Sequence, residues 1–119
     1  MCMSPLLRSE LRERLNFSGY ICSDGDALGF DYHCPRGQMG HCCCNGSAVV
    51  AAATALHAGV DINSGSTYSG HLGEALASGL IRESQLDTAL VRVFTQRFGE
   101  LDSLLSARAR RTRERERER

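Results

Sequence analysis

Apolar residues recur at helical spacing in four stretches of the chain, and two short apolar runs lie between them. The helical stretches are 5–15, 48–58, 68–78 and 86–98. The short runs, Tyr20–Ser23 and Val60–Asn63, are expected to be strands, and each meets polar and glycine residues at its end. Residues 24–46 show no period and are rich in glycine and cysteine, which predicts an irregular loop.

Several residues that favour helix ends stand at the limits of these stretches. Ser4 and Pro5 are suited to the start of the first helix. Ser47 precedes the second helix and Gly59 follows it, and both residue types prefer these positions. Ser84, with an acid three residues later, resembles a capping box for the fourth helix.

The order of the predicted elements is helix, strand, loop, helix, strand, helix, helix. Strands that alternate with helices predict βαβ units and a parallel sheet, and therefore an α/β fold. Two parallel strands alone cannot cover both faces of a sheet or pair both of its edges, so we expect them to be part of a larger sheet. A complete parallel barrel takes about 250 residues, and this chain has 119.

Charge is unevenly distributed, although the formal net charge is zero. Residues 103–119 hold seven arginines and three glutamates, a balance of +4, and residues 1–102 hold seven arginines and eleven acids, a balance of −4. We expect 103–119 to be a charged low-complexity tail, disordered or helical. Because the interleaved glutamates weaken the field that a phosphate backbone would meet, no nucleic acid is expected as a partner. An Arg-rich interaction protein is an alternative.

Six cysteines are many for this length, and most of them lie in the loop at 24–46. Consecutive cysteines make a poor disulfide framework by their spacing. Zinc sites use Cys and His pairs separated by two to four residues, so a metal-binding module is a second alternative. Its ligands would be His33, Cys34, His41, Cys42, Cys43 and Cys44. Since no second well-spaced pair exists, no metal is expected.

The first predicted strand ends on a carboxylate, Asp24, with Gly25 directly behind it. A strand that runs into an Asp-Gly turn is one explanation. The other is an enzyme site, because catalytic side chains in barrel and sheet enzymes project from the carboxyl ends of parallel strands.

Three stretches follow one another along the chain: LLRSELRERLNFSGYICSD, AAATALHAGVDIN and GSTYSGHLGEALASGLIRESQLDTALVRVFTQRFGELD. Together they resemble glycoside hydrolase family 3, and within it the β-xylosidase and α-arabinofuranosidase branch. The resemblance implies that residues 1–102 are the C-terminal quarter of a (β/α)₈ TIM barrel, with Tyr20–Ser23 as strand seven, Val60–Asn63 as strand eight, and flanking helices.

The resemblance also implies a site for a β-linked oligosaccharide or aryl glycoside, without a cofactor. Asp24 falls on the catalytic nucleophile of the family. Tyr32 and His33 correspond loosely to a polar pair at the sugar site, and Asp61 to an acid of strand eight that is either structural or substrate-lining. A retaining glycosidase needs a second, protonated carboxyl group about 5–5.5 Å from the nucleophile, and no acid of this chain matches that position.

Departures from the family pattern bear on activity. Gly25 stands where the family usually has Trp or Cys in the sugar-binding wall, so that contact is lost. The acid/base and the strands that grip the sugar are not in the chain, so we expect it to be inactive alone and poorly folded in isolation. No membrane span and no signal peptide are visible in the sequence. The resemblance is compatible with a secreted or vacuolar parent enzyme.

Overall fold

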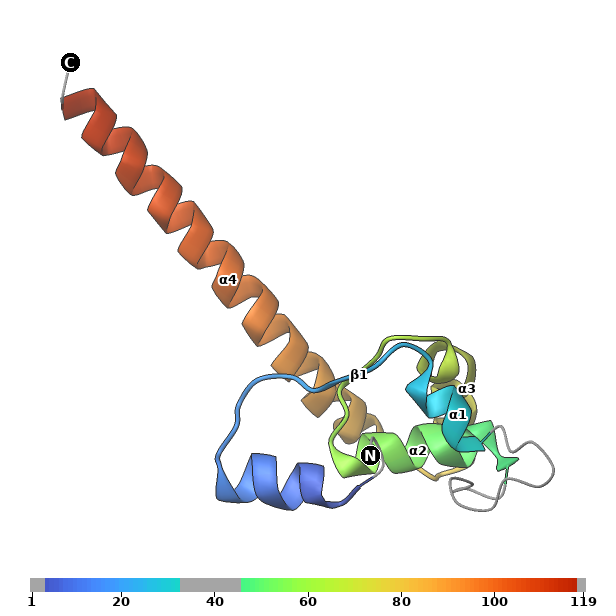
Figure 1. The fold of residues 1–119 in the computed structure, drawn as a ribbon. Helices are drawn as coiled ribbons and strands as arrows, with labels where there is room; N and C mark the ends of the chain where they lie inside the picture. Colours follow the sequence, from blue (N-terminus) through green and yellow to red (C-terminus); the bar gives the residue numbers. More distant parts are fainter. Residues whose placement is uncertain (1–3, 33–45, 118–119) are drawn as a thin grey trace.

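Residues 4–32 and 46–82 form a small body, and one long helix follows them. The computed structural model describes residues 4–32 and 46–117. The elements in chain order are η1 (Leu7–Arg14), β1 (Cys22–Ser23), α1 (Ala27–Tyr32), α2 (Ala48–Ala58), β2 (Ile62–Asn63), α3 (Thr67–Ala77) and α4 (Glu83–Arg117). Helix α4 begins beside the body and runs away from it (Figure 1), so the molecule measures 72 × 30 × 29 Å.

The two strands are parallel neighbours, as the alternating pattern predicts. Cys22 pairs with Ile62 and Ser23 with Asn63, and the Ile62 amide donates to the carbonyl of Ile21 at 3.1 Å. Helices α1 and α2 lie between the strands in the chain, so the segment is a βαβ unit. Both strands are shorter than predicted. In the described ranges the sheet has these two strands only, so each strand has one unpaired edge.

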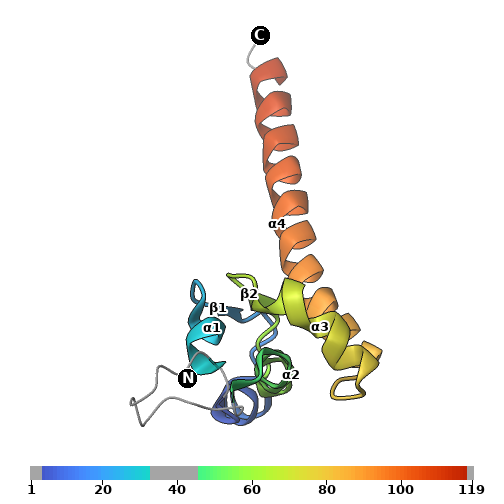
Figure 2. The same ribbon diagram turned by 90° about the vertical axis from the view of Figure 1, so that its right-hand side faces the viewer.

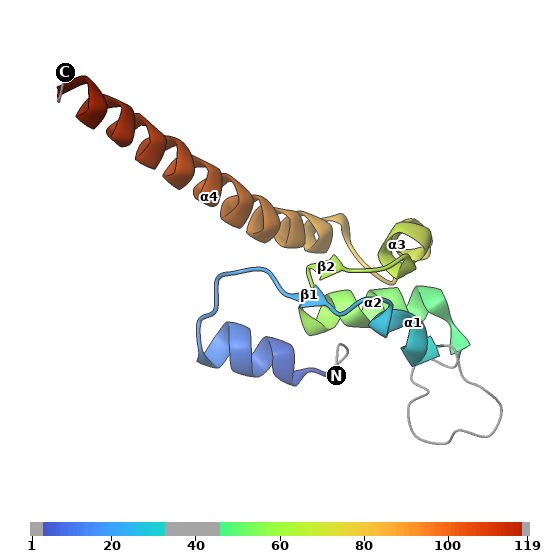
Figure 3. The ribbon, with the colours of Figure 1, turned by 45° about the horizontal axis from the view of Figure 1, so that its top comes forward.

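Alanine fills much of the core around α2, which lies against both strands and against α3 (Figures 2 and 3). One buried cluster joins α2 to α3 and to the first turns of α4: Ala53, Leu56, Ala75, Ile81 and Ala89. A second joins α2 to α1 and to the segment just before β2: Leu28, Ala55 and Val60. Alanine lets backbones approach closely, but each alanine buries little apolar area, so the hydrophobic stabilisation of this body is small.

The ends of α2 confirm the predicted caps. The Ser47 hydroxyl accepts a hydrogen bond from the Val50 amide at 3.3 Å. Gly59 has φ of +100° and donates its amide to the carbonyls at the end of α2. This left-handed conformation favours glycine and explains why the helix ends there.

The capping box predicted at the start of α4 is wrong. The helix begins at Glu83, before Ser84, so Ser84 and Asp87 lie within it. The reciprocal contact that closes this helix end comes from Gln85, whose side-chain oxygen accepts from the Arg82 amide at 2.8 Å. Glutamine three residues after the cap residue makes the same contact in a capping box, but Arg82 lacks the Ser or Thr side chain that supplies the other half of that motif.

Two other segments differ from the pattern-based expectation. The predicted loop 24–46 contains α1, which buries Leu28 completely. A turn initiates it, in which the Ala27 amide donates to the Asp24 carbonyl at 3.2 Å. The predicted tail 103–119 continues α4 without a break as far as Arg117, which corresponds to the helical alternative. Within the described ranges no helix is both long and apolar enough to cross a membrane.

Candidate functional site

Asp24 lies directly after β1, at the carboxyl end of the strand pair. Its side chain is exposed, and one carboxylate oxygen accepts a hydrogen bond from the Gly25 amide at 2.7 Å. An exposed carboxylate whose backbone is held by a strand on one side and a turn on the other is presented to solvent from a fixed position. This is the placement that the enzyme-site hypothesis requires.

The strand end that precedes Asp24 is locked by a buried hydroxyl. Ser23 is 3% exposed, and its oxygen accepts from the Asn63 side-chain amide at 2.9 Å and from the Ser64 amide at 3.2 Å. The side-chain oxygen Oδ1 of Asn63 in turn accepts from the Tyr68 amide at 3.1 Å. These bonds tie the carboxyl ends of both strands to the start of α3, so they fix the backbone from which Asp24 projects.

The loops that follow the two strands approach each other closely. The Asp26 amide donates to the Ser64 carbonyl at 3.0 Å. A Cβ at Gly65 would collide with the end of the Asp26 side chain and lie only 3.1 Å from the Asp26 amide nitrogen, so the close approach of the two loops favours glycine here. At Gly25 an added Cβ would make only an ordinary contact with the Ser64 carbonyl, at 3.7 Å. Gly25 is therefore not needed for packing.

Asp61 lies at the opposite, amino end of the strand pair, and its side chain is 1% exposed. One carboxylate oxygen accepts from the Ile21 amide at 2.8 Å and also pairs with Arg12. The other oxygen accepts from Arg92 at 2.9 Å. Both oxygens are thus occupied by donors from η1, the segment before β1, and α4.

Arg12 connects the Asp61 carboxylate to backbone carbonyls of neighbouring segments. Its guanidinium donates to the carbonyls of Phe17 at 3.0 Å and Gly59 at 3.4 Å, and also to that of Gly19. Burial lowers the pKa of Arg12 from its usual value, the charge of Asp61 opposes this, and the charge of Arg92 lowers the pKa further. Two arginines facing one carboxylate form an ion-pair network that joins three segments distant in the sequence.

Of the predicted site residues whose side chains the structure describes, Asp24 and Asp61 are not brought together. Asp24 and Asp61 lie at opposite ends of the strand pair. Asp61 is expected to be either structural or substrate-lining, and its contacts support the structural role. Tyr32 is the last residue of α1. His33 and the predicted metal ligands Cys34, His41, Cys42, Cys43 and Cys44 lie outside the described residues. In the part of the chain that is described, no three His, Cys, Asp or Glu side chains gather as a metal site would require.

Sequence reasoning missed the residues that hold the strand ends. Ser23 and Asn63 could have been found, since both are polar residues at the carboxyl ends of predicted parallel strands, where their side chains meet. Arg12 and Arg92 carry no comparable signal. Each is one of several arginines in a helical pattern, and only the packing of η1 and α4 against the strands shows that they face one carboxylate.

Comparison with known proteins gives a consistent set of relatives. No protein-family model matches the chain. It is 34% identical over 94 residues to a probable exo-1,4-beta-xylosidase (xlnD) of Aspergillus niger, which covers 77% of this chain and 11% of that protein. It is 37% identical over 98 residues to a probable exo-1,4-beta-xylosidase (bxlB) of Aspergillus clavatus, covering 79% of this chain and 12% of the relative.

A plant protein extends this set beyond fungi. A probable beta-D-xylosidase of Arabidopsis thaliana is 35% identical over 98 residues, covering 82% of this chain and 12% of that protein. The chain therefore spans about a tenth of the length of the curated relatives it matches.

Proposed function

The chain is a segment homologous to xylosidases of the glycoside hydrolase family 3 type, and on this premise we propose that it carries the catalytic nucleophile of a retaining β-xylosidase. The nucleophile is Asp24. Its carboxylate attacks the anomeric carbon, the glycosidic C–O bond breaks, and water hydrolyses the resulting glycosyl ester with net retention. The substrate is a β-linked oligosaccharide or an aryl glycoside.

The observation that carries this proposal is the exposed carboxylate of Asp24 at the carboxyl end of a parallel strand pair. The Ser23 contacts hold the strand end in place. The protonated acid and the remaining sugar contacts come from protein outside this chain, so the segment acts only as part of a larger enzyme. Tyr32 and His33 are proposed to line the sugar.

We further propose that β1 and β2 are strands seven and eight of a (β/α)₈ barrel. Their unpaired edges and the small alanine core support this, because both features indicate missing neighbours. An apolar groove of about 450 Å³ between α3 and α4 is a third supporting feature, and it includes the exposed side chains of Leu76 and Leu90. Protein from the rest of the barrel would cover these surfaces.

The experiment is a chimera in which residues 4–102 replace the homologous segment of the Aspergillus niger exo-1,4-beta-xylosidase. We expect the chimera to hydrolyse an aryl β-xyloside and Asp24→Asn to abolish this, because the amide cannot act as the nucleophile. Asp26→Asn is the matched control, since it makes the same chemical change two residues away and should retain turnover.

A mechanism-based label tests the role of Asp24 directly. A 2-deoxy-2-fluoro-xylosyl donor should accumulate as a covalent ester on the peptide that contains Asp24, because the fluorine slows hydrolysis of the intermediate. A label on another carboxylate, or full turnover in the Asp24→Asn chimera, would show that the nucleophile is elsewhere.

A further inference from the structure

One face of α4 carries apolar residues at alternating spacings of three and four. They are Val91, Phe94, Phe98, Leu101 and Leu105, and their exposed fractions are 63%, 49%, 63%, 50% and 56%. This spacing is the a and d pattern of a heptad repeat, in which apolar positions form the seam between two helices. We call these five residues the α4 seam. It ends at Leu105, because the next d position is Arg108.

The α4 seam lies on the opposite side of the helix from the body. Leu86, Ala89 and Arg92, which contact the core and Asp61, occupy the c, f and b positions when Val91 is a. At 100° per residue, these positions face away from the a and d positions. A second helix can therefore pack on the seam without displacing the contacts that Leu86, Ala89 and Arg92 make.

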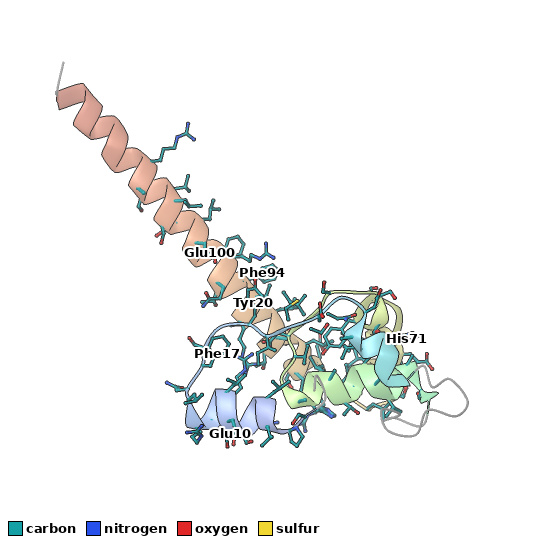
Figure 4. The ribbon with its side chains drawn as sticks, viewed as in Figure 1. Glu10, Phe17, Tyr20, His71, Phe94 and Glu100 are labelled. Carbon is teal, nitrogen blue, oxygen red and sulfur yellow. The ribbon has the colours of Figure 1, made fainter. Side chains whose placement is uncertain are left out.

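The part of α4 that extends from the body leaves the α4 seam open to such packing. Among the described elements, none lies beside α4 beyond its first turns (Figures 1 and 3), and Phe94 lies where the helix leaves the body (Figure 4). The rings of Phe94 and Phe98 stack with their centroids 5.8 Å apart. Exposed apolar stripes of this kind mark interaction surfaces in soluble proteins.

Charges beside the seam indicate which helix covers it. With Val91 at a, Arg97 occupies a g position and Asp102 the e position of the next heptad, five residues later. Parallel, in-register helices bring each g residue next to the following e residue of the partner. Two copies of this chain would therefore form two Arg97–Asp102 pairs across the seam. We propose that α4 forms a parallel two-stranded coiled coil with a second copy of this chain.

The test measures the mass of the full chain in solution by light scattering over a range of concentrations. The wild type should reach about twice its monomer mass of 13.0 kDa. Phe98→Glu places a charge in the seam and should give the monomer mass, whereas Ser103→Glu adds the same charge at an f position and should leave the dimer intact. Far-UV circular dichroism of all three proteins verifies that α4 is helical.

Charge exchange tests the partner and the orientation. Arg97→Asp and Asp102→Arg should each weaken the dimer on the order of tenfold, because each puts like charges in contact twice. Mixing the two variants should restore the affinity, because each mixed dimer regains two opposite-charge pairs.

Three outcomes would overturn the proposal. The first is a wild type that stays monomeric at its highest soluble concentration, which would assign the seam to another part of a longer protein. The second is a mixture that does not regain affinity. The third is association that Phe98→Glu leaves unchanged, which would point to another surface such as the groove between α3 and α4.

Discussion

At the level of single residues, two aspartates next to the strands have opposite surroundings. Asp24 is exposed, and one amide donor contacts its carboxylate. Asp61 is buried, and two arginines and an amide occupy its oxygens. The family resemblance makes both candidate site residues: Asp24 follows the first predicted strand, and Asp61 lies within the second. Only the direction of the strands separates them: one follows its strand and the other precedes it.

Replacing Asp61 by alanine should destabilise the fold strongly. Arg12 would lose its partner in a buried position, and removing one member of a buried pair costs about 3–5 kcal/mol. Arg92 is partly exposed, so we expect a value of about 3 kcal/mol. The measurement is the thermal inactivation midpoint of the chimera, with the exposed Glu100→Ala as control.

The same variant distinguishes the two roles of Asp61. A structural residue should leave KM unchanged at temperatures where the variant is folded. A raised KM for the aryl xyloside, with an unchanged inactivation midpoint, would make Asp61 a substrate-lining residue instead.

At the level of elements, local sequence signals located helices well where both ends carry a specific residue. Helix α2 begins after Ser47 and ends before Gly59, as predicted, because these caps act through neighbouring amides and carbonyls. The predicted strands are longer than the observed ones, because a strand is defined by its pairing with a neighbouring strand and not by its own sequence. The sequence pattern does not reveal α1, because its six residues are too few to show a helical period.

Two glycines should respond in opposite directions to alanine. Gly59→Ala puts a side chain into the left-handed region and should destabilise by about 1–2 kcal/mol. Gly70→Ala lies within α3, where an added Cβ meets nothing within 4 Å, and should stabilise by about 0.5–1 kcal/mol. Thermal inactivation midpoints of the two chimera variants should move apart, and midpoints that shift the same way would contradict the assigned cap.

At the level of the whole molecule, the structure combines a small body with a helix of 35 residues that lies mostly outside it. Much of the body's core is alanine, and each strand has one unpaired edge. The body thus has few of the contacts that make an α/β unit stable alone.

We expect the isolated chain to be helical but to lack a cooperative transition in its body. Far-UV circular dichroism should show helix, and heating should give a broad, shallow change, because each strand has an unpaired edge and much of the core is alanine. A sharp transition at high temperature would contradict this. The chimera is the control, since the restored neighbours should make its unfolding cooperative.

The sequence by itself determined the α/β order of elements, the caps of α2, and the resemblance on which the proposed role of Asp24 rests. These depend on spacing, local hydrogen bonding and the order of motifs. Only the tertiary structure decided that Ser23 and Asn63 lock the strand ends and that Asp61 lies between Arg12 and Arg92 at the far end. It also separated the α4 seam from the face that packs on the body. These features join residues about 30 to 50 positions apart, and which residues meet over such distances depends on how the helices pack around the strands.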